Sequence, residues 1–351
     1  MSYFRESIDR LKGYEPGFQP SQADVIKLNT NENPFPPSPK VMEMLGRITA
    51  EQLRRYPDPL GNRFREAAAE LNGVSPENIL CCNGGDDLLN LAFRAFCDEN
   101  HPAVYPVPTY TLYPVLAKIQ DCQVIEIPFD DEFNLPAKLA ATSAALTIVC
   151  NPNAPSGTLI SAEELASLAD EISGVLLIDE AYVDYAEKNC ASLIKDFDNV
   201  IILRSLSKGY SLAGLRFGYA IAQRDLIDGL IKVKDSYNVD SISIALATAA
   251  IKDQEYFREN IEKIKSERSR LTEQLRKLGF EVLDSSANFV LVRYKNSSAG
   301  EIHKELANRN IYVRYFPYPR LEDKLRISIG TVEQDNKLIA ALKDILAVKH
   351  A

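Results

Sequence analysis

The sequence lacks a long apolar run, an excess of positive charge and the start of a secretory signal. A membrane-spanning helix needs about 20 predominantly apolar residues, and no stretch of the chain reaches that length. The formal net charge of −9 argues against a nucleic-acid partner, because phosphate backbones attract basic surfaces. The first residues have no apolar core of the kind that signal peptides carry. We therefore expect a soluble protein without a membrane or nucleic-acid partner.

Paired cysteines are missing as well. No two of the six cysteines have CxxC spacing, and none has a histidine at the spacing of a zinc ligand. Most lie inside apolar runs, which predicts buried, reduced thiols and a cytoplasmic protein without a bound metal. The cysteines are Cys81, Cys82, Cys97, Cys122, Cys150 and Cys190.

What the sequence does contain is a regular alternation of strands and helices. Continuous apolar strands such as 146–150 are typical of strands buried on both faces of a mostly parallel α/β sheet. A long amphipathic helix over 256–278 then leads into a small α+β unit. A chain of 351 residues suits about two domains. We predict an N-terminal arm (1–29), a large domain (30–250) and a small C-terminal domain (251–351).

Two further helices are expected, one before and one after the predicted strand 78–82 in the sequence. One covers residues 40–53, and it ends where Arg54-Arg55-Tyr56-Pro57 breaks the pattern. The other covers residues 109–119 and follows the strand that begins at Ala103.

A lysine follows a buried strand in the segment 199–219. The apolar run 200–203 leads into Ser205-Leu206-Ser207-Lys208-Gly209. α/β enzymes bind ligands outside the carboxyl ends of their strands, so Lys208 is placed for chemistry. Serine hydroxyls and Arg216 can hold a dianionic phosphate, and a partly desolvated lysine near other cations loses its proton more readily. A lysine nucleophile beside a phosphate site indicates pyridoxal phosphate (PLP), whereas a solvated surface lysine is the simpler alternative.

Three further motifs also follow predicted strands. Gly84-Gly85-Asp86-Asp87 precedes a helix, which suits phosphate binding but is equally an ordinary turn and N-cap. Residues 151–158, Asn-Pro-Asn-Ala-Pro-Ser-Gly-Thr, indicate only a turn when taken alone. Asp179 closes the strand 175–178, and a buried carboxylate there would keep a pyridine nitrogen protonated. Tyr182, three residues later, can bind the phenolate oxygen of such a ring.

In the order NPNAPSG, DEAY and SLSKGYSLAGLR, these motifs resemble those of fold-type I PLP-dependent aminotransferases of class II. More narrowly, the chain is similar to the histidinol-phosphate aminotransferases, through LNTNENPFPPSP, RRYPDP, GGDD, PTY, VRYFPYPR and LRISIG. The resemblance covers essentially the whole chain. It implies a large α/β domain with a mostly parallel seven-stranded sheet flanked by helices, a small α+β domain, and a homodimer with shared active sites. It also implies transamination between histidinol phosphate and 2-oxoglutarate in histidine biosynthesis.

The resemblance assigns roles residue by residue. Lys208 would be the Schiff-base lysine and general base, Asp179 would pair with the pyridinium nitrogen, and Tyr182 would bind the 3′ oxygen. The other implied cofactor contacts are Gly85, Asp86, Ser205, Ser207 and Arg216 at the phosphate, Tyr110 on the ring face, and Tyr56 from the other subunit. The implied substrate contacts are Arg326, at the carboxylate of the amino donor, and Tyr14, Asn31 and Arg314.

One position departs from the family pattern. In this superfamily an asparagine usually stands directly before the proline of the Pro-Thr-Gly turn and binds the 3′ oxygen, whereas this chain has Ala154 there. Asn153 stands one residue earlier. Either Asn153 substitutes through a changed backbone path, or Tyr182 holds that oxygen alone.

Other functions share most of these motifs. Threonine-phosphate decarboxylases and broad aromatic aminotransferases use the same scaffold, and pocket shape decides which Cα bond lies perpendicular to the ring. A PLP-responsive transcription regulator would need a DNA-binding module of about 60 residues or more. Only about 30 residues precede the body of this chain. The full-length match favours transamination.

Overall fold

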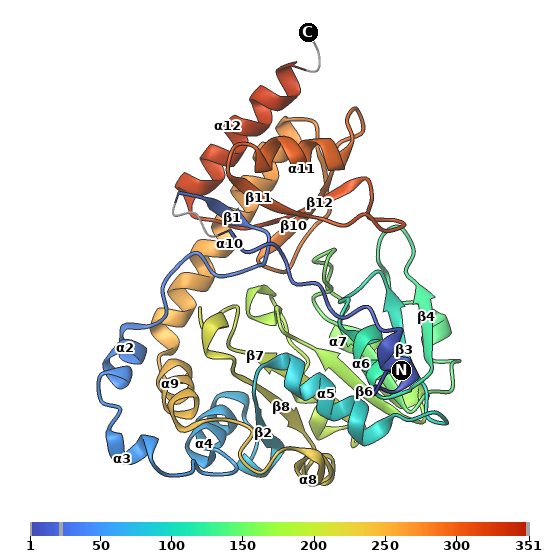
Figure 1. The fold of residues 1–351 in the computed structure, drawn as a ribbon, viewed down its shortest axis with the longest axis vertical. Helices are drawn as coiled ribbons and strands as arrows, with labels where there is room; N and C mark the ends of the chain where they lie inside the picture. Colours follow the sequence, from blue (N-terminus) through green and yellow to red (C-terminus); the bar gives the residue numbers. More distant parts are fainter. Residues whose placement is uncertain (1, 21–23, 349–351) are drawn as a thin grey trace.

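Two sheets organise the chain, which we describe from a computed structural model for residues 2–20 and 24–348. The seven-stranded sheet lies in the lower body in Figure 1, and the five-stranded sheet lies above it. The long helix α10 (Gln254–Lys277) runs from one body to the other (Figure 1). The predicted fold class, an α/β protein with a mostly parallel seven-stranded sheet, is confirmed.

The large sheet has the strand order β2-β8-β7-β6-β5-β3-β4. Its strands are β2 (Ile79–Cys82), β3 (Ala103–Val107), β4 (Val124–Pro128), β5 (Leu146–Cys150), β6 (Val175–Asp179), β7 (Val200–Ser205) and β8 (Gly218–Ala222). Neighbours from β7 to β4 are parallel, and β8 is antiparallel to both β2 and β7. The sequence pattern did not predict β8, because its residues, Gly-Tyr-Ala-Ile-Ala, include glycine and alanine, which are depleted in strands.

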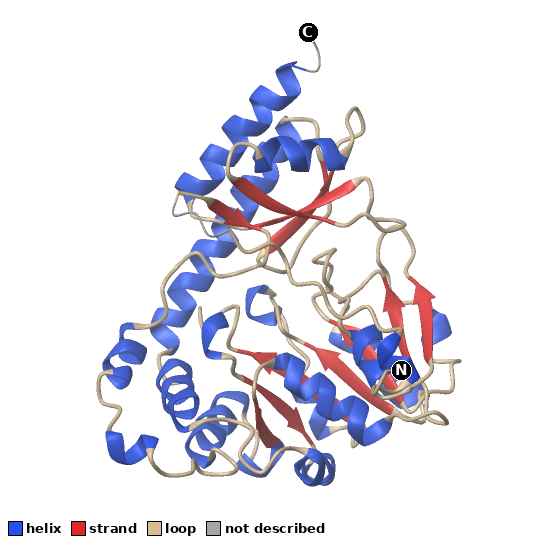
Figure 2. Ribbon diagram, viewed as in Figure 1, coloured by secondary structure: helices blue, strands red, loops and turns tan. Residues whose placement is uncertain are grey.

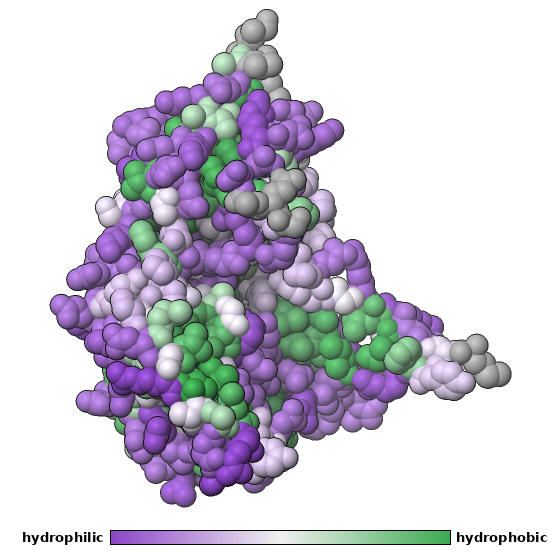
Figure 3. Space-filling view, turned by 60° about the vertical axis from the view of Figure 1, so that its left-hand side comes forward, coloured by the Kyte–Doolittle hydropathy of each residue, from purple (hydrophilic) through white to green (hydrophobic). Residues whose placement is uncertain are grey.

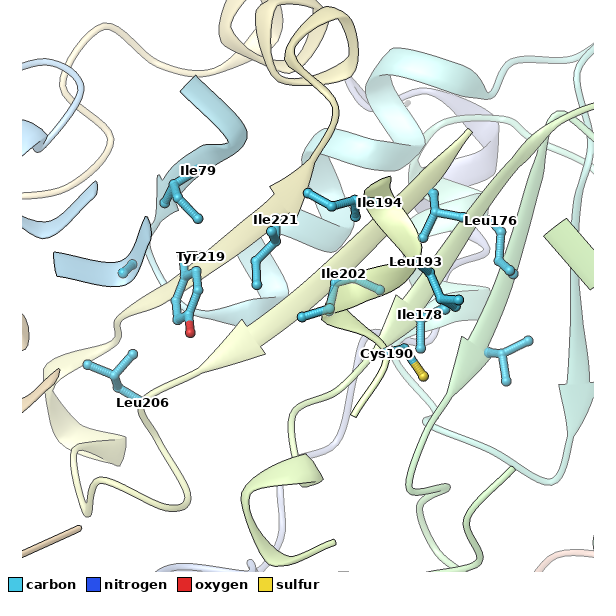
Figure 4. Packing of buried hydrophobic residues seen from close by; sticks show 14 of the residues in the cluster. Ile79, Leu176, Ile178, Cys190, Leu193, Ile194, Ile202, Leu206, Tyr219 and Ile221 are labelled. Atoms are coloured by element: carbon cyan, nitrogen blue, oxygen red, sulfur yellow. The ribbon is translucent and has the colours of Figure 1, made fainter. Parts of the chain in front are cut away.

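Helices cover both faces of this sheet (Figure 2). One face packs against α4 (Asn62–Asn72), α7 (Ala162–Glu171) and α9 (Ser241–Ile251), and the other against α5 (Gly85–Phe96), α6 (Tyr113–Ile119) and α8 (Arg224–Val233). Side chains alternate between the faces, so Leu176 and Ile178 lie in one cluster and Leu177 in the other. Figure 4 shows the first face, where Ile178, Ile202 and Ile221 extend from neighbouring strands. Burial on both faces explains the continuous apolar runs.

Two predicted helix ranges were wrong. Residues 40–53 form two short helices, α2 (Pro39–Leu45) and α3 (Ala50–Leu53), because Thr49 and Gln52 form a capping box that begins a new helix. Residues 109–119 are helical only from Tyr113, where α6 begins. The four residues before α6 are therefore free to take part in the cavity described below.

The smaller sheet has the order β1-β11-β12-β10-β9. Its strands are β1 (Ile26–Leu28), β9 (Glu281–Val282), β10 (Phe289–Arg293), β11 (Ile311–Tyr315) and β12 (Lys324–Ser328). Side chains from α10, α11 (Ala299–Ala307) and α12 (Val332–Val348) pack with the sheet into one apolar cluster. β1 lies within the predicted arm, and its pairing with β11 attaches the end of that segment to the smaller sheet.

The beginning of the arm contacts the large body instead. The short helix α1 (Glu6–Asp9) lies beside α6, and Arg5 forms an ion pair with Asp121.

The remaining short elements are the 3₁₀ helices Pro76–Asn78, Ala137–Leu139, Val183–Tyr185, Ala191–Lys195 and Ala213–Leu215. All six cysteines are buried and unpaired. Among the described helices, none combines the length and apolarity needed to cross a membrane.

Candidate active site

A cavity of about 210 Å³ opens where β5, β6 and β7 end. These strands are parallel neighbours with Cys150, Asp179 and Leu203 in register, so the segments that follow them meet at one edge. This cavity, called the central cavity below, also receives side chains from the smaller sheet. The predicted site residues that line it are Tyr14, Gly85, Asp86, Tyr110, Asp179, Tyr182, Ser205, Ser207, Lys208, Arg216, Arg314 and Arg326. Asn31, Tyr56 and Asn153 do not line it.

Lys208 lies on the wall of the central cavity. Its Nζ donates a hydrogen bond to the carbonyl of Thr30 (3.2 Å) and lies 5.6 Å from the centre of the Tyr182 ring. Burial, reinforced by the positive charge of Arg326, lowers the pKa of Lys208 to about 8. A substantial fraction of this amine is therefore neutral and nucleophilic near physiological pH.

The loop that carries Lys208 is held from two sides. The Asn33 side-chain amide donates to the carbonyls of Lys208 and Gly209, at 3.2 Å each. The Tyr210 ring stacks on Phe257 of α10 with 4.2 Å between centroids. These contacts fix the backbone on which the reactive amine is mounted.

Asp179 is a buried carboxylate at the end of β6, with 4% of its surface exposed. Its Oδ2 accepts a hydrogen bond from Tyr113 (2.8 Å), and its Oδ1 accepts one from the Ala181 amide (3.1 Å). Burial raises the pKa of Asp179 to about 6, although both hydrogen bonds oppose the shift. No lysine or arginine of the described chain forms an ion pair with it. The site therefore suits a ligand that brings a cationic nitrogen to Asp179.

Tyr113 was not predicted as a site residue. It is fully buried, and its ring packs edge-on against Tyr110, with 5.6 Å between centroids. It therefore supports two predicted cofactor contacts, Tyr110 and Asp179. The only sequence signal for Tyr113 was its position three residues after the predicted site residue Tyr110. That spacing cannot reveal its hydrogen bond to Asp179, which is 66 residues away in the sequence.

An anion site faces the N-terminus of α5. Gly84 precedes the helix with φ +85°, and no side chain caps the amides of the first turn. With ψ at 171°, this backbone conformation is one that glycine adopts readily and other residues rarely do, and an added Cβ would also lie 2.7 Å from Arg216 Nη2. Unpaired amides and the helix dipole together favour a bound anion such as a phosphate.

Side chains from the lysine motif complete this anion site. Arg216 donates to Ser207 Oγ and lies 3.3 Å from Asp86 Oδ2. Ser205 Oγ accepts from the Ser207 amide (3.2 Å), which holds both hydroxyls at the end of β7. Asp86 also accepts a hydrogen bond from Tyr110 (3.1 Å), so the anion site is connected to the predicted ring contact.

Two arginines of the smaller sheet line the opposite wall. Arg314 and Arg326 are directly opposite each other on β11 and β12. Arg326 donates to the Asn29 carbonyl (3.0 Å) and lies over the Phe289 ring, and burial together with the charge of Arg314 lowers its pKa. Neither arginine forms an ion pair with a carboxylate of the described chain. Like charges opposite each other are unfavourable, so this wall suits an anionic substrate group.

Asn31 and Asn153 lie just outside the central cavity. The Asn31 amide donates to Tyr182 Oη (3.0 Å), so it contacts a predicted catalytic residue from behind. Asn153 is 1% exposed, donates to the Pro108 carbonyl and Ser156 Oγ, and accepts from Thr109. Its amide has no free group for a ligand, which favours the alternative in which Tyr182 holds the 3′ oxygen alone.

Tyr56 is far more exposed than the other predicted residues, with 82% of its surface accessible. Its ring stacks on Tyr237 at 4.5 Å, on the outside of the large body. Within one chain it is therefore not part of the central cavity.

The chain is similar to known aminotransferases in sequence. The family model described as aminotransferase class I and II matches residues 23–342. Histidinol-phosphate aminotransferase 1 of Trichormus variabilis is 46% identical over 347 residues, covering 98% of this chain and 99% of the relative. Histidinol-phosphate aminotransferase of Rhodopirellula baltica is 43% identical over 334 residues, covering 94% of this chain and 92% of the relative.

Solved structures show the same fold. Histidinol-phosphate aminotransferase of Sinorhizobium meliloti, in complex with pyridoxal-5′-phosphate, has a TM-score of 0.91 at 26% identity, covering 99% of this chain and 98% of that one. L-threonine-O-3-phosphate decarboxylase of Porphyromonas gingivalis has a TM-score of 0.80 at 23% identity, covering 92% of this chain and 100% of that one. The second likeness shows the fold alone.

The lowered pKa of Lys208 predicts selective reactivity. In protein freed of bound ligands, trace acetylation at pH 7.5 should modify Lys208 roughly 10- to 100-fold faster than exposed lysines, because far more of its amine is neutral. Peptide mass spectrometry would measure the rates. Arg326→Gln, which removes a nearby cation, should slow the labelling of Lys208 and leave the other lysines unchanged. Equal rates at Lys208 and at exposed lysines would contradict the assignment.

Proposed function

The chain belongs to the aminotransferase class I and II family, and from this membership we propose that it is a PLP-dependent histidinol-phosphate aminotransferase. In the biosynthetic direction it would transfer the amino group of glutamate to imidazole acetol phosphate in histidine biosynthesis. The observation that carries the proposal is the combination, in one cavity, of Lys208 and the unpaired carboxylate of Asp179, facing two arginines that lack a counterion. The full-length relatives support the choice of substrate.

The residues present fit PLP, which when bound supplies an electron sink for the carbanion formed at the substrate's Cα. Lys208 would hold the aldehyde carbon covalently until the substrate amine displaces it, and its freed amine would then serve as the base that moves the proton of the 1,3-shift. Asp179 would keep the ring nitrogen protonated, and Tyr182 would donate to the 3′ oxygen. The α5 amides, Ser205, Ser207 and Arg216 would hold the phosphate, and the first turn of α5 has no side-chain cap that would compete for its amides. Tyr110 would contact the ring face.

The arginine wall would receive two unlike substrates by turns. Histidinol phosphate has a phosphate and no carboxylate, whereas glutamate has two carboxylates. A guanidinium binds either group in a bidentate manner, so Arg314 and Arg326 can serve both substrates. Tyr14, which packs edge-on against Tyr110 at 5.9 Å, would close this end of the cavity.

We further propose a homodimer with shared active sites. The helices α2 and α3 carry exposed apolar side chains, which include Met42, Leu45 and Leu53, and the exposed rings of Tyr56 and Tyr237 stack on each other. Figure 3 turns the side that carries α2, α3 and α9 forward and shows hydrophobic residues gathered on its lower part. Contiguous exposed apolar surface is typical of an interface, and burying it would let Tyr56 reach the partner's phosphate site.

The proposed domain division and location rest on similar grounds. Two separate sheets with their own apolar clusters support a large domain over 30–250 and a small one over 251–351, with 1–29 as an arm. Six buried thiols without disulfides support a reducing compartment, which we propose is the cytoplasm.

A substrate panel tests the function. The purified protein, supplied with PLP and 2-oxoglutarate, should form glutamate with histidinol phosphate at a higher kcat/KM than with phenylalanine or tyrosine. Threonine phosphate should release no CO2. Release of CO2 without glutamate would identify a decarboxylase instead, and a preference for phenylalanine or tyrosine would identify a broad aromatic aminotransferase.

Arg326→Ala should separate the two half-reactions. If Arg326 binds the α-carboxylate, which histidinol phosphate lacks, glutamate should lose about ten- to a hundredfold more kcat/KM than histidinol phosphate, the effect of one charge-assisted bond. Stopped-flow spectroscopy of each half-reaction would measure this difference. Arg293→Ala, on the neighbouring strand β10 and outside the cavity, is the matched control. Equal losses in both half-reactions would mean that Arg326 serves the fold or the phosphate.

Tyr56 is predicted to act across the dimer. Tyr56→Phe and Lys208→Ala proteins, each weak alone, should regain activity when their subunits exchange, because each mixed dimer has one site without either defect. Activity after mixing, with exchange followed by native mass spectrometry, would measure the recovery. Exchange without recovery would show that Tyr56 acts within its own chain or not at all.

A further inference from the structure

Asn31 joins the smaller sheet to the active-site tyrosine. It is 1% exposed and has φ +56°, a left-handed conformation that asparagine tolerates better than most residues. Its side chain lies between Tyr182, on the wall of the central cavity, and Ser328 at the end of β12. Its backbone carbonyl accepts from the side chain of Asn288 (3.0 Å). The residue is therefore fixed on several sides before any ligand binds.

The hydrogen bonds around Ser328 favour one orientation of the Asn31 amide, because the reversed amide would leave the buried Ser328 proton without the acceptor it has in Asn31 Oδ1. Ser328 Oγ accepts from the Asn31 backbone amide (2.9 Å), so its own proton is free to go to Asn31 Oδ1 (2.8 Å). With Oδ1 committed to Ser328, the Nδ2 group faces Tyr182 and must donate to it (3.0 Å). The oxygen of Tyr182 is thus an acceptor on the side away from the cavity.

A phenol has one proton, and here only the cavity side is left for it. Tyr182 keeps that proton at ordinary pH, because burial raises its pKa to about 12. If the Asn31 amide were reversed, Oδ1 would face Tyr182 and would take its proton. The Ser328 hydroxyl is the group that distinguishes the two orientations.

We propose that Ser328 and Asn31 are positioning residues that direct the hydroxyl proton of Tyr182 into the cavity, toward the 3′ oxygen of PLP. The inference rests on the proposed function, since it assumes PLP in the cavity. The proton of Tyr182 matters more in this chain than in relatives with an asparagine at position 154. Ala154 has no hydrogen-bonding side chain and the Asn153 amide already bonds to other residues, so Tyr182 is the side chain available to the 3′ oxygen. A donor at the 3′ oxygen stabilises its negative charge, so it lowers the pH at which the bound cofactor loses its imine proton.

The test is the visible absorbance of the holoenzyme as a function of pH, without substrate. Ser328→Ala should let the Asn31 amide turn and should raise the midpoint of the absorbance change by roughly one pH unit, the equivalent of about one net hydrogen bond. Tyr182→Phe should raise it by at least as much. Ser328→Thr, which restores a hydroxyl, should return the midpoint toward that of the wild type.

The controls distinguish an effect of the Asn31 amide orientation from a general loss of stability. Ser243→Ala deletes another buried hydroxyl, in α9, and should lower Tm without moving the midpoint. In the Tyr182→Phe background, Ser328→Ala should cause no further shift. The other titratable groups that interact with Tyr182 are unchanged in the Ser328 variants. They are Tyr110, Cys150, Asp179, Tyr185, Lys208 and Arg326.

The outcomes distinguish the inference from the proposed function. A wild-type protein that binds no PLP and shows no visible absorbance would overturn both. A normal wild-type titration with an unchanged midpoint in Ser328→Ala would overturn the inference alone. A full shift that persists in the Tyr182→Phe background would also overturn it, because the effect would then not pass through Tyr182.

Discussion

The structure of the site depends on a buried carboxylate that has no cation of its own in the described chain. Asp179 can stay ionised near neutral pH because Tyr113 and the Ala181 amide donate to it, while burial acts in the opposite direction. The parallel register of β5, β6 and β7 holds it at the sheet edge between the loops of the other motifs. A cationic ring nitrogen would supply the positively charged partner that Asp179 lacks in the described chain.

Lys208 shows the same principle with the opposite sign. Asp179 gains affinity for a proton through burial, and Lys208 loses affinity through burial and through the nearby charge of Arg326. The two groups are therefore both moved toward their neutral forms before a ligand binds. The arginine wall and the N-terminus of α5 place positive charge at two ends of the cavity. A cofactor phosphate at one end and an anionic substrate group at the other would balance the positive charge at both ends.

Sequence patterns located the parts of the site that follow buried strands. Asp179, Ser205 and Lys208 lie at one sheet edge, because neighbouring parallel strands have their carboxyl ends at the same edge. The patterns missed Tyr113 and Ser328, whose importance lies in partners 66 and 297 residues away in the sequence. They also missed β8, whose glycine and alanines have low strand propensity and which pairs with β2 and β7 in the fold. The break between α2 and α3 followed from a local capping box that the apolar pattern concealed.

The segment 29–31 connects these parts most directly. The Asn29 carbonyl accepts from Arg326, the Thr30 carbonyl accepts from Lys208, and the Asn31 side chain donates to Tyr182. Three consecutive residues thus contact the three side chains that we propose bind the substrate carboxylate, the cofactor aldehyde and the 3′ oxygen. The segment directly follows β1, which belongs to the smaller sheet, and Ser328 of β12 holds its last residue. This tripeptide therefore links the arginine wall of the smaller sheet to Lys208 and Tyr182 of the large body.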